Sequence, residues 1–167
     1  MDLRSQISDL IEGGAQDDAP TRKQYSRDTS IFERTPAVVV FPKSSEDVAR
    51  LVQLAHDEKK AGNNVSIAPR SAGSDMTGGP LTDSISVVFT KYMNRLLEMG
   101  SDYAVVEPGI YYRDFEKKTL AHSGLILPSF PASREICALG GMLANNSGGE
   151  LTLKYGKFGQ EPLRYAE

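Results

Sequence analysis

Two glycine-rich segments hold most of the residues that could bind a ligand in this chain of 167 residues. The first glycine loop spans residues 68–80 (APRSAGSDMTGGP), and the second spans residues 131–149 (PASREICALGGMLANNSGG). Glycine permits positive φ and close approach of a ligand, so successive backbone N–H groups can turn toward one anion. Arg70 adds a fixed positive charge. The pair of loops predicts a nucleotide-cofactor site, whereas one such loop alone is equally typical of an ordinary turn.

Other phosphate and catalytic signatures are absent from the sequence. Neither G-x-x-x-x-G-K-[ST] nor G-x-G-x-x-G occurs, which disfavours P-loop NTPases and Rossmann dehydrogenases. No G-x-S-x-G elbow is present, and His56 and His122 lie near the ends of helical patterns. The sequence therefore shows no set of residues typical of a hydrolase. The single cysteine, Cys137, excludes an internal disulfide and a cysteine cage, and no metal site is predicted.

Composition limits the partners and the location. The net charge is −3 and the basic residues are interspersed with acids, so nucleic acid is not an expected partner. No apolar stretch is long enough to cross a bilayer, and the N-terminus lacks the apolar core of a signal peptide. We predict a cytoplasmic protein without a membrane span and leave open a peripheral association with the inner face of a membrane.

Hydrophobic periodicity predicts alternating strands and helices. Leu3, Ile7 and Leu10 predict a short N-terminal helix, followed by a polar linker to about Arg34. The remaining predicted elements are strands at 37–41, 65–68, 84–90, 103–107 and 125–128 and helices at 44–60 and 112–121, with 93–99 ambiguous. The side chains predicted to face the core from the two helices are Val48, Leu51, Val52, Ala55, Phe115 and Leu120. A β-α-β unit therefore leads directly into the first glycine loop.

Short motifs follow one another in a fixed order along the chain. They are YSRDTS (25–30), PAVVVFPKSSEDV (36–48), PRSAGSDMTGG (69–79), VEPG (106–109), PASREI (131–136) and GGMLANNSGG (140–149). In this order they resemble the FAD-linked oxidases and dehydrogenases of the vanillyl-alcohol oxidase / p-cresol methylhydroxylase (PCMH) type. Within that superfamily they are most similar to the D-lactate dehydrogenase, glycolate oxidase and 2-hydroxyglutarate dehydrogenase branch. The similarity runs from about residue 25 to residue 159.

The resemblance implies an α+β PCMH-type FAD-binding domain, with the first subdomain and the start of the second. It divides the chain into an N-terminal helix and linker, 1–24, and an incomplete FAD-binding domain, 25–167. In the family a complete second subdomain and a substrate cap follow, so the chain is expected to be an N-terminal fragment. Extended FAD would lie between the two subdomains.

Motif matching also assigns residues to the cofactor. The first loop would bind the pyrophosphate, and the second would line the adenosine, ribityl and pyrophosphate stretch, with Gly140 and Gly141 permitting close approach. The implied FAD-binding residues are Pro69, Arg70, Ser71, Ala72, Gly73, Ser74, Asp75, Pro131, Ala132, Ser133, Ile136, Cys137, Gly140, Gly141, Asn145, Asn146, Ser147 and Gly148. Because the first loop lacks a histidine, the FAD is expected to be non-covalent. Catalytic residues are unknown and are expected beyond residue 167.

The function implied is that of the FAD-binding portion of an oxidoreductase. Its parent enzyme would pass a hydride from a 2-hydroxy acid such as D-lactate or glycolate to the flavin and then electrons to an unidentified acceptor. The alternative is a non-catalytic nucleotide-binding or interaction module that retains only the first flavin subdomain. Alone, the fragment is expected to lack turnover, to bind FAD weakly or not at all, and to self-associate.

Overall fold

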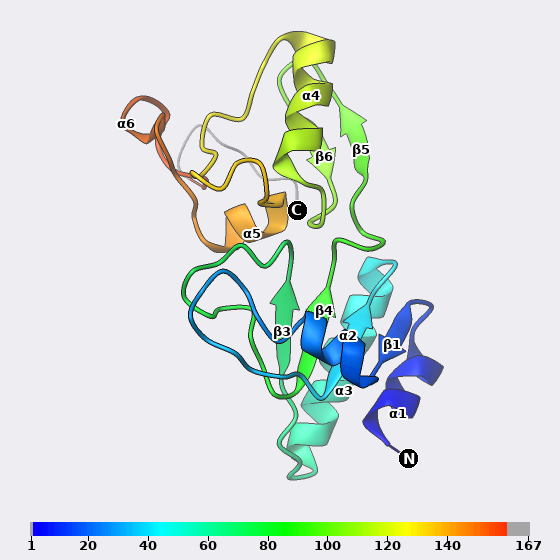
Figure 1. Cartoon of the computed structure of the whole chain (residues 1–167). Coiled ribbons are helices and arrows are strands. Elements are labelled where there is room, and N and C mark those ends of the chain that lie inside the picture. Colours follow the sequence, from blue (N-terminus) through cyan, green and yellow to red (C-terminus); the bar gives the residue numbers. More distant parts are fainter. Residues whose placement is uncertain (1, 160–167) are drawn as a thin grey trace.

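The computed structural model describes residues 2–159, which form two parts arranged one above the other (Figure 1). The lower part contains a four-stranded sheet of order β1-β2-β4-β3. Its strands are β1 (Gly14–Gln16), β2 (Val38–Phe41), β3 (Ile67–Arg70) and β4 (Ile85–Val88). Strands β2, β3 and β4 run parallel, and β1 is antiparallel to β2. The carboxyl ends of β3 and β4 point toward the upper part (Figure 1).

The central strands are buried on both faces of the sheet. All residues of β2 and β4 are buried. One face packs against α1 (Leu3–Leu10) and α3 (Ser45–Lys60) in a first core made of Ile7, Ile11, Ala15, Val38, Val40, Leu51, Ile85 and Val87. On the other face Val39, Phe41 and Val88 pack against Tyr25. Continuous apolar runs, rather than alternating ones, are the pattern expected for parallel strands covered on both sides.

The segment predicted as a polar linker contains two unpredicted elements. Strand β1 pairs with β2 through its backbone, and α2 (Ala19–Gln24) begins where the Asp18 carboxylate accepts a hydrogen bond from Thr21 N. Edge pairing needs no apolar side-chain pattern, so periodicity gave no signal for β1. The domain boundary after residue 24 remains a prediction.

The upper part holds a hairpin and three helices around a second core. The hairpin strands are β5 (Leu96–Met99) and β6 (Ala104–Val106), and the helices are α4 (Tyr112–Ser123), α5 (Leu139–Ala144) and α6 (Thr152–Tyr155). The core consists of Ile110, Tyr112, Phe115, Phe130, Cys137, Leu139 and Met142. Between residues 2 and 159 no helix combines the length and apolar character that a bilayer crossing requires.

Three local predictions are wrong. Residues 125–128 form no strand, because the Leu127 carbonyl accepts a hydrogen bond from the Tyr112 hydroxyl (2.8 Å) rather than from a neighbouring strand. Val52 and Leu120 are exposed, by 56% and 49%. In α3 the buried face passes through Asp47 and Leu51, so a polar residue occupies a position where periodicity favours an apolar one.

Asp47 joins the start of α3 to two other segments. Its side chain is fully buried, and its carboxylate accepts hydrogen bonds from Glu12 N (2.9 Å), Gly13 N (3.0 Å) and Lys43 N (2.9 Å). A Cβ at residue 13 would lie 2.1 Å from the Phe41 carbonyl oxygen, so only glycine fits there. The carboxylate therefore holds the chain after α1 against the end of β2.

We predict that Asp47→Ala lowers the free energy of unfolding by about 3 kcal/mol, because three backbone N–H groups lose a charged acceptor. The matched control is Asp57→Ala in the same helix, where the exposed carboxylate accepts, among residues 2–159, hydrogen bonds from the Gln53 side chain alone. That change should cost under about 0.5 kcal/mol. Urea unfolding of both variants measures the difference, and equal losses would contradict the role of Asp47.

Candidate functional site

The two glycine loops meet at the backbone carbonyl of Pro108. The Ser71 hydroxyl donates a hydrogen bond to this oxygen (2.7 Å), and Gly140 N donates a second (2.8 Å). Pro108 follows β6, and α5, which carries Gly140, lies just beyond the carboxyl end of β3 (Figure 1). In open α/β sheets, ligands bind outside the carboxyl ends of parallel strands. One predicted residue of each loop, Ser71 and Gly140, is thus brought to the edge where a ligand is expected.

Backbone pairing continues from this junction into the second loop. Leu139 N donates to the Ile110 carbonyl (3.0 Å), and Tyr112 N donates to the Cys137 carbonyl (3.0 Å). Together with the bond from Gly140, these contacts fix residues 137–140 against the start of α4. Residues 137–140 of the second loop are therefore positioned by backbone hydrogen bonds.

Adjacent glycines at the junction have different surroundings. A Cβ on Gly140 would lie 2.6 Å from Pro108 Cβ and 2.8 Å from its carbonyl oxygen. A Cβ on Gly141 would meet only Ser71 Cβ at 3.5 Å, which is ordinary contact. Within the protein, the close approach belongs to Gly140, and Gly141 faces the first loop with room for a small side chain.

The first loop presents backbone N–H groups that the protein does not use. Among residues 2–159, no acceptor receives a hydrogen bond from the amides of Ala72, Gly73 or Ser74. Gly73 has φ +72°, which is a left-handed conformation. A left-handed residue in a turn lets the N–H groups on either side of it converge. Consecutive free amides around such a residue form the type of concavity that binds anions.

The Asp75 carboxylate faces its own loop. It accepts hydrogen bonds from the Thr77 hydroxyl and from Gly79 N, both at 2.7 Å. Burial alone would raise the pKa of Asp75, but these hydrogen bonds outweigh it and hold the pKa below its usual value. The negative charge is therefore compensated by hydrogen bonds from residues that follow it in the loop.

Arg134 is a residue of the second loop that sequence analysis did not select. Its guanidinium Nη2 lies 2.5 Å from Glu116 Oε1 and its Cζ lies 4.5 Å from the centre of the Phe130 ring. The hydrogen bond with Glu116 raises the pKa of Arg134. The Tyr112 hydroxyl also contacts this pair, since it lies 3.0 Å from Glu116 Oε1, and it lies 2.8 Å from the Leu127 carbonyl. This network fastens the chain that enters the second loop to α4.

Two other predicted site residues, Cys137 and Ser147, have side chains that are buried inside the protein. The Cys137 side chain belongs to the second core, and burial raises the pKa of its thiol. Ser147 is buried, and its backbone bonds to Met142 and Phe158. Asn146 has φ +46°, a conformation that asparagine tolerates better than most residues. The exposed members of the predicted set are Pro69, Ala132, Ile136, Asn145 and Asn146.

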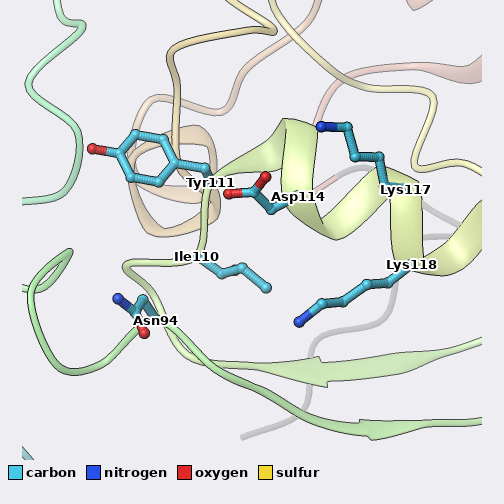
Figure 2. Close-up of a pocket in the computed structure, with 6 residues that line it drawn as sticks. All are labelled: Asn94, Ile110, Tyr111, Asp114, Lys117 and Lys118. Carbon is cyan, nitrogen blue, oxygen red and sulfur yellow. The ribbon is translucent and has the colours of Figure 1, made fainter.

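A cavity of about 450 Å³ lies beside the junction, between the start of α4 and the β5–β6 hairpin (Figure 2). Its lining residues are Asn94, Ile110, Tyr111, Asp114, Lys117 and Lys118. In Figure 2 the Tyr111 ring points away from the two lysines, and both lysine side chains extend along the cavity. None of these residues was selected from the sequence, because charged residues on an exposed helix face are common and carry no distinguishing pattern.

A two-part α+β domain with glycine loops at the carboxyl ends of parallel strands is an architecture of cofactor-binding proteins. A sequence model described as an FAD binding domain matches residues 36–162, and the chain belongs to this family. The predicted FAD cofactor and the predicted resemblance are confirmed.

The relatives are oxidases and dehydrogenases. The chain is 32% identical over 139 residues to the glycolate oxidase subunit GlcD of Bacillus subtilis, covering 81% of this chain and 28% of that protein. It is 29% identical over 157 residues to the D-2-hydroxyglutarate dehydrogenase of Escherichia coli, covering 90% of this chain and 15% of that protein. The chain thus spans less than a third of the length of either relative.

Solved structures confirm the predicted fold class. An alkyldihydroxyacetonephosphate synthase superposes with a TM-score of 0.72 at 31% identity, covering 86% of this chain and 28% of the other. The 6-hydroxy-D-nicotine oxidase of Arthrobacter nicotinovorans superposes with a TM-score of 0.71 at 24% identity, covering 88% and 31%. The second likeness concerns the fold alone.

The glycine pair gives a test of the junction. We predict that Gly140→Ala destabilises the fold by about 2 kcal/mol, because its new methyl group overlaps Pro108. Gly141→Ala should change stability by less than about 0.5 kcal/mol, since the methyl group reaches only ordinary contact. Thermal unfolding of both variants checks the difference. A Gly140→Ala protein as stable as Gly141→Ala would show that the loops do not approach closely at Pro108.

Proposed function

We propose that the two glycine loops bind FAD, with the backbone amides of Ala72, Gly73 and Ser74 holding the pyrophosphate. The observation that carries this proposal is the run of three amides without an acceptor among the described residues, beside the junction at Pro108. Three or more charge-assisted N–H bonds are the usual means by which a loop binds a phosphate. The small side chains of the loop allow the cofactor to approach the backbone.

The second loop would line the rest of the cofactor. Ser133, Gly141 and Gly148 are small and half-buried, and Gly141 faces Ser71 across the junction. Of the other predicted contacts in this loop, Cys137 and Ser147 would act through backbone groups, since both side chains are buried. Bound FAD supplies a two-electron acceptor, and the residues of this chain bind and orient it.

We further propose that the whole protein oxidises a 2-hydroxy acid. The names of two relatives, glycolate oxidase subunit and D-2-hydroxyglutarate dehydrogenase, support this substrate class. The electron acceptor, the catalytic residues, a cytoplasmic location and self-association are outside this support and stay predictions. The competing hypothesis is a nucleotide-binding module without redox activity.

FAD titration followed by flavin fluorescence tests the cofactor site. We predict that Gly73→Val weakens binding at least ~10-fold, equivalent to about 1.4 kcal/mol, because a branched side chain disfavours φ +72° and displaces the amides. Gly78→Val is the matched control, since Gly78 also has positive φ (+84°) in the same loop but lies beyond Asp75. Equal losses in the two variants would contradict the placement of the pyrophosphate at Ala72–Ser74.

Two assays of the longest natural form of the protein separate the functional alternatives. Acid precipitation should release the flavin into the supernatant, because the first loop has no histidine to form a covalent link. D-lactate, glycolate or D-2-hydroxyglutarate should reduce an artificial dye acceptor. Flavin that stays in the pellet would contradict non-covalent binding, and FAD binding without turnover of any 2-hydroxy acid would favour the non-catalytic module.

A further inference from the structure

The segment 25–34 precedes the matched domain, yet it contacts the first glycine loop on both sides of the free amides, at Arg70 and at Asp75. Arg70, at the start of the loop, donates a hydrogen bond from Nη2 to the Arg27 carbonyl (2.7 Å). Asp75 accepts two at its backbone carbonyl, from Thr29 N (3.1 Å) and from the Thr29 hydroxyl (2.8 Å). The four residues between these contacts, 71–74, include the three free amides.

The Arg70 side chain packs between Gly73 of the loop and the Tyr25 ring. Its side chain is 7% exposed, and a Cβ on Gly73 would lie 2.2 Å from its Nη2 and 2.6 Å from its Cζ. The guanidinium Cζ is 5.5 Å from the centre of the Tyr25 ring, which itself packs on the sheet. The guanidinium is therefore enclosed between the turn at Gly73 and the segment 25–34.

A buried guanidinium requires a compensating charge, and the same segment supplies it. Burial lowers the pKa of Arg70, while the nearby Asp28 carboxylate opposes this change. Arg70 Nη1 and Asp28 Oδ2 are both buried and have no hydrogen-bond partner among residues 2–159. Leaving such groups unpaired is unfavourable, because each has given up its hydrogen bonds to water. This cost argues that the arrangement is retained for a reason other than stability.

We infer that Arg70 and the segment 25–34 form a positioning element that sets the conformation of the first glycine loop for its ligand. The inference rests on the proposed function for the identity of that ligand. Arg70 acts by packing against Gly73 and by bonding to the Arg27 carbonyl, and the Thr29 contacts hold Asp75 on the other side of the free amides. The cofactor site thus includes a segment outside the matched domain.

Amide hydrogen exchange at Thr29 reports this element without any ligand, since Thr29 N bonds to the loop at Asp75. Arg70→Met should speed exchange at Thr29 at least ~10-fold by loosening the loop. Arg50→Met is the matched control, because Arg50 also donates to a backbone carbonyl, that of Leu10, far from the loop. Arg70→Lys, which keeps a charged donor, should restore part of the protection. Unchanged exchange in Arg70→Met would overturn the inference.

Ligand binding gives the second measurement. Arg70→Met should weaken FAD binding at least ~10-fold while its urea unfolding midpoint stays equal to that of Arg50→Met, and FAD should slow exchange at Thr29 in the unchanged protein. If Arg70→Met does not fold, Thr29→Val tests the same element through the loss of one hydrogen bond, and unaltered affinity there would overturn the inference. Failure of the longest natural form of the protein to bind FAD would defeat the proposed function, whereas exchange at Thr29 still decides the positioning role.

Discussion

The site depends on one carbonyl oxygen with two donors. Pro108 lies between a hairpin and a helix of the upper part, and its oxygen accepts from Ser71, which follows a strand of the lower part, and from Gly140 of the second loop. A carbonyl has two lone pairs, so both bonds form without competition. The relative position of the two loops therefore follows from one peptide group. The close packing of Gly140 on Pro108 fixes the distance between the second loop and this group.

Each loop is also held by an arginine of its own. Arg134 pairs with Glu116 on α4 and covers Phe130, and Arg70 is enclosed by Gly73 and Tyr25. The guanidinium group suits both tasks, because its planar face packs on rings while its N–H groups reach carboxylates or carbonyls. Positive charges near the loops thus shape the backbone, and the free amides remain available for an anion.

Sequence patterns predicted the parts of the fold that local periodicity determines. The strand at 37–41, the helix from Ser44 and the helix ending before Gly124 were found, because apolar spacing and caps are encoded by adjacent residues. Strand β1 was missed because only one of its three residues, Ala15, is buried, and a single buried residue shows no periodicity. Composition identified both glycine loops, but not the contacts of Arg70, Thr29 and Pro108, since a backbone acceptor leaves no trace in residue type.

The first and second cores have no residue in common. Substitutions at distant, unconnected positions change stability additively, so the apolar interior of each part can vary without regard to the other. The geometry of the hydrogen bonds at Pro108 is the constraint that both parts share. A substitution that shifts β3 also shifts the donor Ser71, and one that shifts α4 also shifts the acceptor Pro108. Each core can therefore change under its own packing limits, whereas residues at the junction are constrained by both parts of the domain.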